Sequence, residues 1–237
     1  IEDRGAIDTA KRVRQHIGAV FRYGVPLNLA THDPSAVLRD AMKPKPRTVS
    51  RAALKAKEVP DFIKRLSDYD GEASTAIGLE LIMHTMVRTN ELRFARWDEF
   101  EDDLWRIPAE RMKMSREHIV PLTKHVRHLL SLLPKTCEWV VPGRDSKPMS
   151  QNTLIFAMYR LGYHSKATVH GFRGLASTVL NESEMWSPDA IERQLAHVPG
   201  DTVRSAYNSA QYLAERRRMM DWWSNWLLDQ GKRGTTF

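Results

Sequence analysis

Residues 169–180 carry the pattern that most restricts what this chain can fold into. Five apolar positions recur there at helical spacing: Val169, Phe172, Ala176, Val179 and Leu180. This spacing predicts a helix that turns one apolar face toward a protein core. His170, Arg173 and Ser177 form the adjacent stripe of the same helix, so the imidazole and the guanidinium are expected to project together.

A second helix is predicted to begin shortly afterwards. Ser187 has the chemistry of an N-cap, and Pro188 suits the first helical position. His197 falls at the far end of this helix, just before a Val-Pro-Gly-Asp break at 198–201. Tyr207 follows in a segment that is expected to be a short helix. The chain therefore presents an arginine, two histidines and a phenol within 40 residues.

Two cationic residues upstream, Arg88 and Lys113, complete a set that suits phosphoryl transfer to a tyrosine. A phosphodiester in transfer spreads negative charge over its oxygens, and the planar fork of an arginine pairs with two of them at once. A phenol has a pKa of about 10 and is a weak nucleophile, so it needs a nearby proton acceptor. A lysine can protonate the leaving oxygen. Tyr207 is the favoured nucleophile, and Tyr212 is the alternative.

These residues, in this order, resemble the motifs of the tyrosine recombinases, the phage-integrase family. The likeness is greatest to the branch carried by satellite prophages and genomic islands, and it covers roughly residues 56–230. The matching motifs are Arg88-Thr-Asn-Glu91-Leu92, the hairpin lysine Lys113, His170-x-x-Arg173, Leu195-Ala-His197 and Ala206-Tyr207. Two positions depart from the family's pattern, because Met86 and Ala196 stand where glycine is frequent. Neither position carries chemistry.

The resemblance implies a role for each residue of the catalytic set. That set is Arg88, Lys113, His170, Arg173, His197 and Tyr207. The tyrosine would form a 3′-phosphotyrosyl link while the two arginines clamp the phosphate and the lysine protonates the 5′ oxygen. His170 would assist proton transfer at the phenol, and His197 would donate to the phosphate. Glu91 would hold the Arg88 region. The resemblance implies no metal and no other cofactor.

The remaining patterns predict a mixed, mainly α fold in which a helical catalytic domain carries a small antiparallel three-stranded sheet. Residues 75–87 are nearly all apolar and predict a buried helix that ends at Arg88. Short strands are expected at 96–100, 104–107 and 118–122, with Lys113 in the second hairpin. Residues 211–230 predict a long helix whose methionine and tryptophan stripe favours the core over an interface with a neighbouring protomer. The arginines at 216–218 could contact DNA or lie in solvent.

Three histidines raise the question of a metal site. His125 and His128 are three positions apart, as a metal-binding pair on a helix would be. No third ligand stands at a recognisable spacing, so a solvated helix face is the favoured interpretation. His84 lies inside the apolar run and is interpreted as a hydrogen-bonded core histidine.

The first 57 residues are predicted to precede the catalytic domain. Residues 1–42, with helices at 7–21 and 35–42, are interpreted as the C-terminal helices of a truncated core-DNA-binding domain. A helical extension packed on the main domain is the alternative. Residues 43–57 form a basic linker in which four cations are candidate DNA contacts: Lys43, Lys45, Arg47 and Arg51. A merely solvated linker is the alternative here. The catalytic domain is expected at 58–237, and the missing initial Met suggests a fragment.

Composition narrows the class of protein and its partners. The net charge of +7 favours a polyanionic partner, although charge alone is only suggestive. A single cysteine, Cys137, excludes an internal disulfide and fits a reducing bacterial cytoplasm. No apolar run approaches the roughly 18 residues of a membrane span.

The expected function is site-specific recombination of double-stranded DNA at attachment sites, which integrates or excises a mobile element. A homotetramer is expected on DNA and a monomer without it, with the protein in the cytoplasm and on the nucleoid when bound. Two alternatives stay open. A type IB topoisomerase would use a similar residue set to relax DNA as a monomer, and a non-catalytic DNA-binding regulator would bind without any covalent link.

Overall fold

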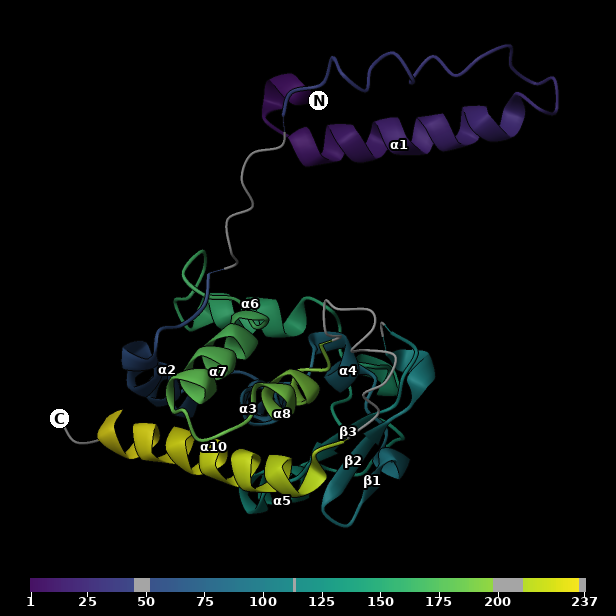
Figure 1. Ribbon diagram of the computed structural model, residues 1–237. Helices are drawn as coiled ribbons and strands as arrows, with labels where there is room; N and C mark the ends of the chain where they lie inside the picture. Colours follow the sequence, from purple (N-terminus) through teal and green to yellow (C-terminus); the bar gives the residue numbers. More distant parts are fainter. Residues whose placement is uncertain (45–51, 113, 198–210, 235–237) are drawn as a thin grey trace. The chain divides into compact units, whose positions relative to one another are not determined.

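The computed structural model describes residues 1–44, 52–112, 114–197 and 211–234, which Figure 1 draws in colour. The chain divides into two compact units, Ile1–Ser50 and Arg51–Phe237. Every residue of the candidate catalytic set belongs to the second unit. No described helix is long and apolar enough to cross a membrane.

The first unit consists of a short 3-10 turn, η1 (Glu2–Arg4), the long helix α1 (Ile7–Gly24) and a loop. The helix predicted at 7–21 is confirmed, but the helix predicted at 35–42 is wrong, because these residues form turns. Asp33 Oδ1 accepts hydrogen bonds from the Ser35 backbone N and Oγ, at 2.9 and 2.7 Å. Val37 is 79% exposed, so the segment buries little apolar surface that could stabilise a short helix.

The second unit is mainly helical. Its helices are α2 (Val59–Ser67), α3 (Ala73–Thr85), α4 (Thr89–Arg93), α5 (Lys124–Ser131), α6 (Thr153–Arg160), α7 (Gly171–Glu182), α8 (Pro188–Gln194) and α10 (Leu213–Gly234). Short 3-10 turns lie between them: η2 (Ala56–Glu58), η3 (Trp97–Glu99), η4 (Ala109–Arg111) and η5 (Arg144–Ser146). Ser187 caps α8 as predicted, since its Oγ accepts from the Ala190 backbone N at 3.3 Å.

Helix α3 forms the centre of this unit and packs against α5, α6, α7 and α10 (Figure 1). A helix that is apolar on all sides has to be enclosed by others. Leu79, Ile82 and Met83 are accordingly at most 3% exposed. The helix ends at Met86, which takes a left-handed conformation with φ 61°. The chain turns there, and Arg88 follows at the start of α4.

A three-stranded antiparallel sheet lies on one side of the helices. Its strands are β1 (Phe100–Glu101), β2 (Leu104–Ile107) and β3 (His118–Pro121), in the order β1-β2-β3. The predicted mixed, mainly α fold with a small sheet is confirmed. The strand expected at 96–100 is wrong in extent, because residues 97–99 form the η3 turn. That turn directs the Glu99 carboxylate toward Trp105, whose Nε1 donates to it at 2.8 Å.

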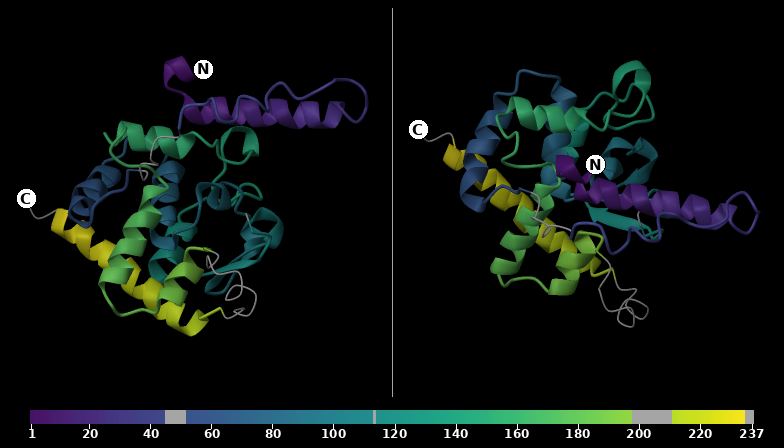
Figure 2. Two further views of the ribbon diagram at one scale, coloured as in Figure 1. Left: turned by 45° about the horizontal axis from the view of Figure 1, so that its top comes forward. Right: turned by 90° about the horizontal axis from the view of Figure 1, so that it is seen from above.

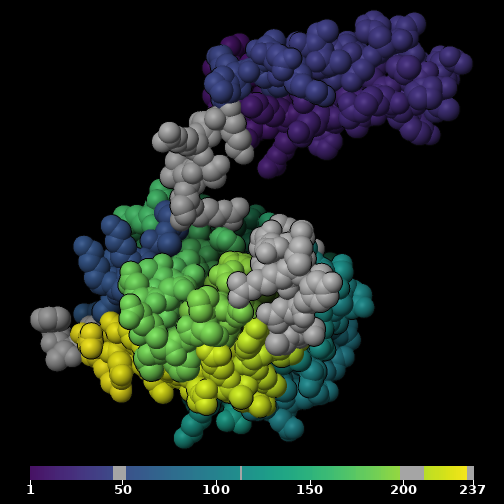
Figure 3. All heavy atoms as spheres, viewed as in Figure 1, coloured from purple at the N-terminus to yellow at the C-terminus, as the bar shows by residue number. Residues whose placement is uncertain are grey.

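The C-terminal helix α10 packs on its own chain, as the prediction of a core stripe requires. It runs past α2 and α8 (Figure 2), and on one face of the molecule it lies beside α7 and α8 (Figure 3). Met219, Met220 and Trp223 are fully buried. The Trp223 Nε1 donates to the Met83 carbonyl oxygen of α3 at 2.9 Å. Helix α10 therefore covers part of the core and contributes directly to holding α3.

Candidate active site

Arg88 is fixed at the first turn of α4 by Glu91. The Glu91 carboxylate accepts from the Arg88 backbone N at 2.6 Å and from Arg88 Nη1 at 2.7 Å, which is a capping arrangement. The prediction that Glu91 holds the Arg88 region is confirmed. Arg88 Nη2 also donates to the Ala196 carbonyl oxygen at 3.1 Å. The Arg88 side chain keeps 26% of its surface exposed, so its guanidinium can still meet a ligand.

Arg173 lies deeper, in the first turn of α7, and is only 4% exposed. Its Nη1 donates to the Met86 carbonyl oxygen, and its Nη2 donates to the Leu195 carbonyl oxygen. The side chain therefore joins the end of α3 to the end of α8. Burial, and next the charge of Arg88, lower the pKa of Arg173 to about 10. The guanidinium stays protonated at neutral pH, and the carboxylates of Glu91 and Glu192 partly offset the lowering of its pKa.

His197 stands just after α8, where the chain turns through Ala196 at φ 47°. Its Nδ1 lies 2.8 Å from Glu192 Oε2, and its Nε2 lies 3.2 Å from Arg173 Nη2. Donation from Nδ1–H to the carboxylate orients the ring and directs Nε2 toward the buried guanidinium. Glu192 is a residue that the sequence analysis missed. Its only local signal is that it lies on the helix that ends beside His197.

His170 occupies the N-cap position of α7 and lines a cavity of about 380 Å³ together with Arg88. The chain at Ala52, within the predicted linker at 43–57, passes close to this helix start. A Cβ at Gly171 would lie 2.7 Å from the Ala52 carbonyl oxygen, so only glycine leaves room for the crossing chain. Thr168 N donates to the same oxygen at 3.1 Å. The second unit therefore begins beside the cavity that Arg88 and His170 line.

The structure thus brings together four of the six predicted residues. Arg88, Arg173 and His197 form one hydrogen-bonded cluster through the chain at 195–196, and His170 shares a cavity with Arg88. Two arginines and two imidazoles at one place can bind an oxyanion and move protons around it. Predicted residues outside the described part of the chain are Lys113, Tyr207, Lys45, Arg47 and Arg51. Lys43 is described and lies in the first unit.

Arg111 in η4, between β2 and β3, is another supporting residue that was not predicted from the sequence. Its guanidinium pairs with the Glu99 carboxylate and donates to the carbonyl oxygen of Phe94. Its Nη2 donates to the Glu91 carbonyl oxygen at 2.7 Å. Arg111 thereby connects η4 to α4, the helix that carries Arg88. The signal for this role is tertiary, since the partners lie between 12 and 20 residues away in sequence.

A third missed feature is a buried pair, Arg216 and Gln194, behind the cluster. Arg216 is 0% exposed, so the prediction that it contacts DNA or solvent is wrong. Its Nε and Nη2 donate to Gln194 Oε1 at 3.1 and 2.8 Å, and Nη1 donates to the Gln211 carbonyl oxygen at 3.2 Å. Gln194 Nε2 donates in turn to the Thr85 carbonyl oxygen at 2.9 Å. The pair therefore ties α10 to the ends of α8 and α3.

His118 in β3 is a buried imidazole surrounded by positive charge. It is 3% exposed, and its Nε2 has no hydrogen-bond partner among the described residues. Burial lowers the pKa of His118 well below its usual value. Four arginines from different elements lower it further: Arg216, Arg173, Arg193 and Arg88. The ring is therefore neutral in the folded protein at neutral and mildly acidic pH.

Acid is expected to destabilise the fold through His118. The unfolded chain takes up a proton on this histidine below its usual pKa of about 6.5, while the native ring does not. Each pH unit below 6.5 therefore removes up to about 1.4 kcal/mol from the free energy of unfolding until the native pKa is reached. Urea denaturation from pH 8 to pH 5 measures this slope. His118→Gln should flatten the slope, whereas His128→Gln, on the exposed face of α5, should leave it unchanged. Equal slopes in all three proteins would contradict the assignment.

Comparison with known proteins identifies relatives of both units. Residues 52–213 match the phage integrase family, and residues 1–41 match the phage integrase central domain. The integrase of Enterobacteria phage P4 is 40% identical over 96% of this chain and 56% of its own length. Prophage integrase IntS of Escherichia coli (strain K12) is 39% identical over 95% of this chain and 60% of its own length. The chain thus spans little more than half the length of these relatives.

The fold also has solved counterparts. A lambda integrase tetramer bound to a Holliday junction aligns with a TM-score of 0.66 and 20% sequence identity. The alignment covers 84% of this chain and 61% of that one. At 20% sequence identity, this structural similarity is evidence for a shared fold alone.

Proposed function

Because the chain belongs to the phage integrase family of tyrosine recombinases, we propose that it cleaves and rejoins DNA at specific sites through a 3′-phosphotyrosyl intermediate. The net reaction would integrate or excise a mobile element. The observation that supports this proposal most directly is the convergence of Arg88, Arg173 and His197, which come from three separate helix ends. Two guanidiniums and an imidazole at one place suit a phosphodiester in transfer.

In the proposed reaction, the Tyr207 phenol oxygen attacks the scissile phosphorus, and the bond from phosphorus to the 5′ oxygen breaks. His170 accepts the phenol proton, and Lys113 supplies a proton to the leaving 5′ oxygen. Arg88 and Arg173 hold the non-bridging oxygens, and His197 donates to one of them when its Nε2 also carries a proton. The energy of the broken bond is retained in the phosphotyrosyl link. The 5′ hydroxyl of a partner strand can therefore attack that link and rejoin the DNA without ATP.

We further propose how the chain is divided into domains. Residues 1–42 would be the end of a core-DNA-binding domain, residues 43–57 a basic linker, and residues 58–237 the catalytic domain. The match of residues 1–41 to the phage integrase central domain supports this division. Four basic side chains would follow the phosphate backbone: Lys43, Lys45, Arg47 and Arg51. The partner would be double-stranded attachment-site DNA, in the bacterial cytoplasm and nucleoid.

A homotetramer on DNA would pair four active sites with four strands, and the protein would be monomeric without DNA. The lambda integrase tetramer on a Holliday junction supports this assembly by its likeness of fold. The two alternative functions are less well supported. A type IB topoisomerase would act as a monomer, whereas the relatives are integrases. A non-catalytic regulator would not need two arginines and a histidine held in one hydrogen-bonded cluster.

The deciding experiment traps the covalent intermediate. The purified chain is incubated with duplexes that span the ends of its mobile element and carry a bridging 5′ phosphorothiolate. Cleavage then releases a thiol that cannot rejoin, so a protein–DNA adduct accumulates and appears on a denaturing gel. We expect an adduct with the native chain and with Tyr212→Phe, and none with Tyr207→Phe. These two variants are matched controls, because each removes one phenol oxygen.

Each other outcome has a distinct meaning. An adduct lost in Tyr212→Phe but kept in Tyr207→Phe would retain the chemistry and move the nucleophile. Relaxation of a supercoiled plasmid that lacks attachment sites would favour the topoisomerase alternative. Binding that weakens with salt, without any adduct even when the part of the relatives outside this chain is restored, would leave only the DNA-binding regulator.

A further inference from the structure

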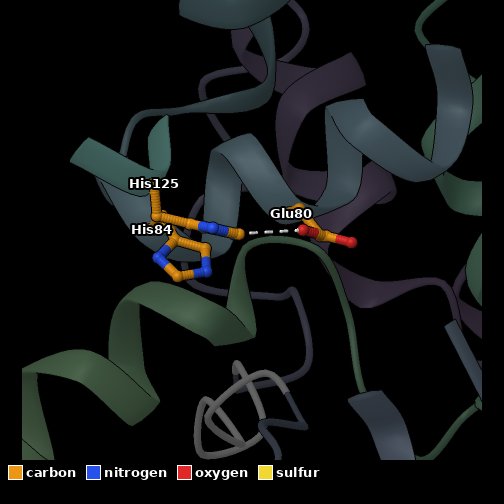
Figure 4. Close-up of side chains that lie close together, drawn as sticks. All are labelled: Glu80, His84 and His125. Atoms are coloured by element: carbon orange, nitrogen blue, oxygen red, sulfur yellow. Dashed lines mark hydrogen bonds and ion pairs between the residues drawn. The ribbon is translucent and has the colours of Figure 1, made fainter. Parts of the chain in front are cut away.

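A second cluster of polar side chains lies between α3 and α5. Glu80 and His84 are one turn apart on α3, and His125 projects toward them from α5 (Figure 4). One ligand atom from each of the three residues lies within 4.8 Å of the other two. His125 Nε2 is 3.4 Å from Glu80 Oε2, and the ring centroids of His84 and His125 are 4.5 Å apart. Two imidazoles and a carboxylate therefore lie close together.

The buried histidine of this cluster is oriented from behind. His84 Nδ1 lies 2.9 Å from Ser224 Oγ of α10, and Thr123 Oγ1 donates to the same oxygen at 3.2 Å. When Nδ1–H donates to Ser224, the other ring nitrogen, Nε2, carries a lone pair and no proton. Metal-binding histidines are commonly held in this way by a hydrogen bond at the second nitrogen. Burial lowers the pKa of His84 to about 3, so the ring is neutral.

The surroundings leave space for an ion. The three side chains line a cavity of about 200 Å³ whose other walls include Met83, Leu227 and Leu228. His84 is 5% exposed, whereas the side chains of His125 and Glu80 are 22% and 35% exposed. The cavity is thus apolar on its inner side and open at the edge where the carboxylate stands. An ion could enter at that edge and keep a water molecule as a further ligand.

We propose that Glu80, His84 and His125 bind a divalent transition-metal ion of the zinc class, with water in the fourth position. Three ligands of nitrogen and carboxylate oxygen are a set that zinc accepts, at about 2.0–2.2 Å from each. That geometry needs the ligand atoms to approach to about 3.4 Å from one another. Small rotations of the partly exposed Glu80 and His125 can bring them there, while His84 stays fixed.

The ion would be structural, because it joins α3 to α5. Helix α3 ends at Met86, whose carbonyl oxygen holds Arg173. A link at positions 80 and 84 therefore holds the helix that supports the candidate active site. This site revises the expectation from sequence, where His125 was paired with His128 and no third ligand was recognised. The rings of that pair are 6.5 Å apart.

The test is metal binding by the tag-free chain after treatment with a chelator. Co²⁺ is the optical probe, and Zn²⁺ is titrated by calorimetry. We expect one Zn²⁺ per chain and visible absorption from Co²⁺ in a site of low coordination number. Zn²⁺ at about 100 times its dissociation constant should raise the Tm by roughly 5–10 °C. Glu80→Gln and His125→Gln should raise the dissociation constant at least about 10-fold. Both positions are partly exposed, so both variants should fold.

His128→Gln is the matched control, because it removes a histidine from the next turn of α5 and should change nothing. If His128→Gln weakens binding and Glu80→Gln does not, the pair on α5 is the site and the proposal is wrong. Binding that survives in both Glu80→Gln and His125→Gln belongs to other histidines and also overturns it. So does the absence of a Tm shift with Zn²⁺ in the native chain, since the cluster is then a neutral hydrogen-bonded group.

Discussion

Replacing Arg173 with alanine is expected to abolish covalent adduct formation and to destabilise the fold at the same time. The guanidinium donates to the carbonyl oxygens of Met86 and Leu195, and Nη2 lies 3.2 Å from His197 Nε2. Without it, two buried carbonyls lose their donor, at about 1–3 kcal/mol each, partly offset by removing a buried charge. We expect a net loss of about 2–4 kcal/mol in urea denaturation. The adduct should form at least about 10³-fold more slowly.

Arg173→Lys separates charge from geometry. The ammonium keeps the positive charge, but it cannot present a planar fork to two carbonyl oxygens and a phosphate. We expect the Arg173→Lys variant to fold with a moderately lowered free energy of unfolding. It should form the covalent adduct about 10²-fold more slowly than the native chain. Arg65→Ala is the control, because this exposed arginine forms an ion pair with Asp61 on the same helix and should change stability by less than about 1 kcal/mol. Full activity in Arg173→Lys would show that charge alone suffices.

Replacing Arg216 with methionine is expected to lower both stability and activity, although this buried residue is not one of the predicted catalytic residues. The exchange leaves Gln194 Oε1 and the Ile119 and Gln211 carbonyl oxygens without their donor. Burial, and next Arg193, lower the pKa of Arg216 to about 9, so removing this charge relieves part of the cost. A net loss of about 2–4 kcal/mol follows. Since Gln211 comes four positions after Tyr207, adduct formation should slow about 10-fold or more.

A double-mutant cycle identifies the pair as the cause. Gln194→Met alone leaves the Arg216 charge buried with fewer acceptors, whereas the double variant replaces both partners with apolar side chains. The double variant should therefore be less destabilised than the sum of the single variants, by about 1–3 kcal/mol. Arg218→Met removes an exposed arginine from the same helix and should be nearly neutral. Strict additivity in the cycle would show that Arg216 and Gln194 act independently.

The contrast between Arg216 and Ser187 shows how far the sequence could predict this fold. The Oγ of Ser187 caps α8 by accepting a hydrogen bond from the backbone N of Ala190, three residues further along the chain. This signal is local in sequence, and the prediction of that helix start is confirmed. The run of three arginines at 216–218 looks solvated, because charged residues are rarely buried without an acid. The buried Arg216 guanidinium donates hydrogen bonds to acceptors that lie 22 and 97 positions away in sequence. No local sequence pattern predicts these partners.

The candidate site likewise contains residues that the sequence predicted and supporting partners that it did not predict. Chemistry and order predicted Arg88, His170, Arg173 and His197, and the structure places these four at two adjoining features, one cluster and one cavity. Their supporting partners were not predictable, because carbonyl acceptors such as that of Leu195 have no sequence signature. The helix expected at 35–42 failed for a related reason. Its apolar residues looked able to pack, but they stay largely exposed, with Val37 at 79% and Leu38 at 49%.

Met86 and Ala196 both take a left-handed conformation and stand at places where the family often has glycine. The structure makes each of them present its carbonyl oxygen to an arginine, Met86 to Arg173 and Ala196 to Arg88. A side chain at positive φ costs roughly 1–2 kcal/mol, which a small part of a domain's stability can absorb. Glycine at these two positions would therefore relieve backbone strain, but the chemistry does not require it. A search that demands glycine at these two places would overlook chains such as this one.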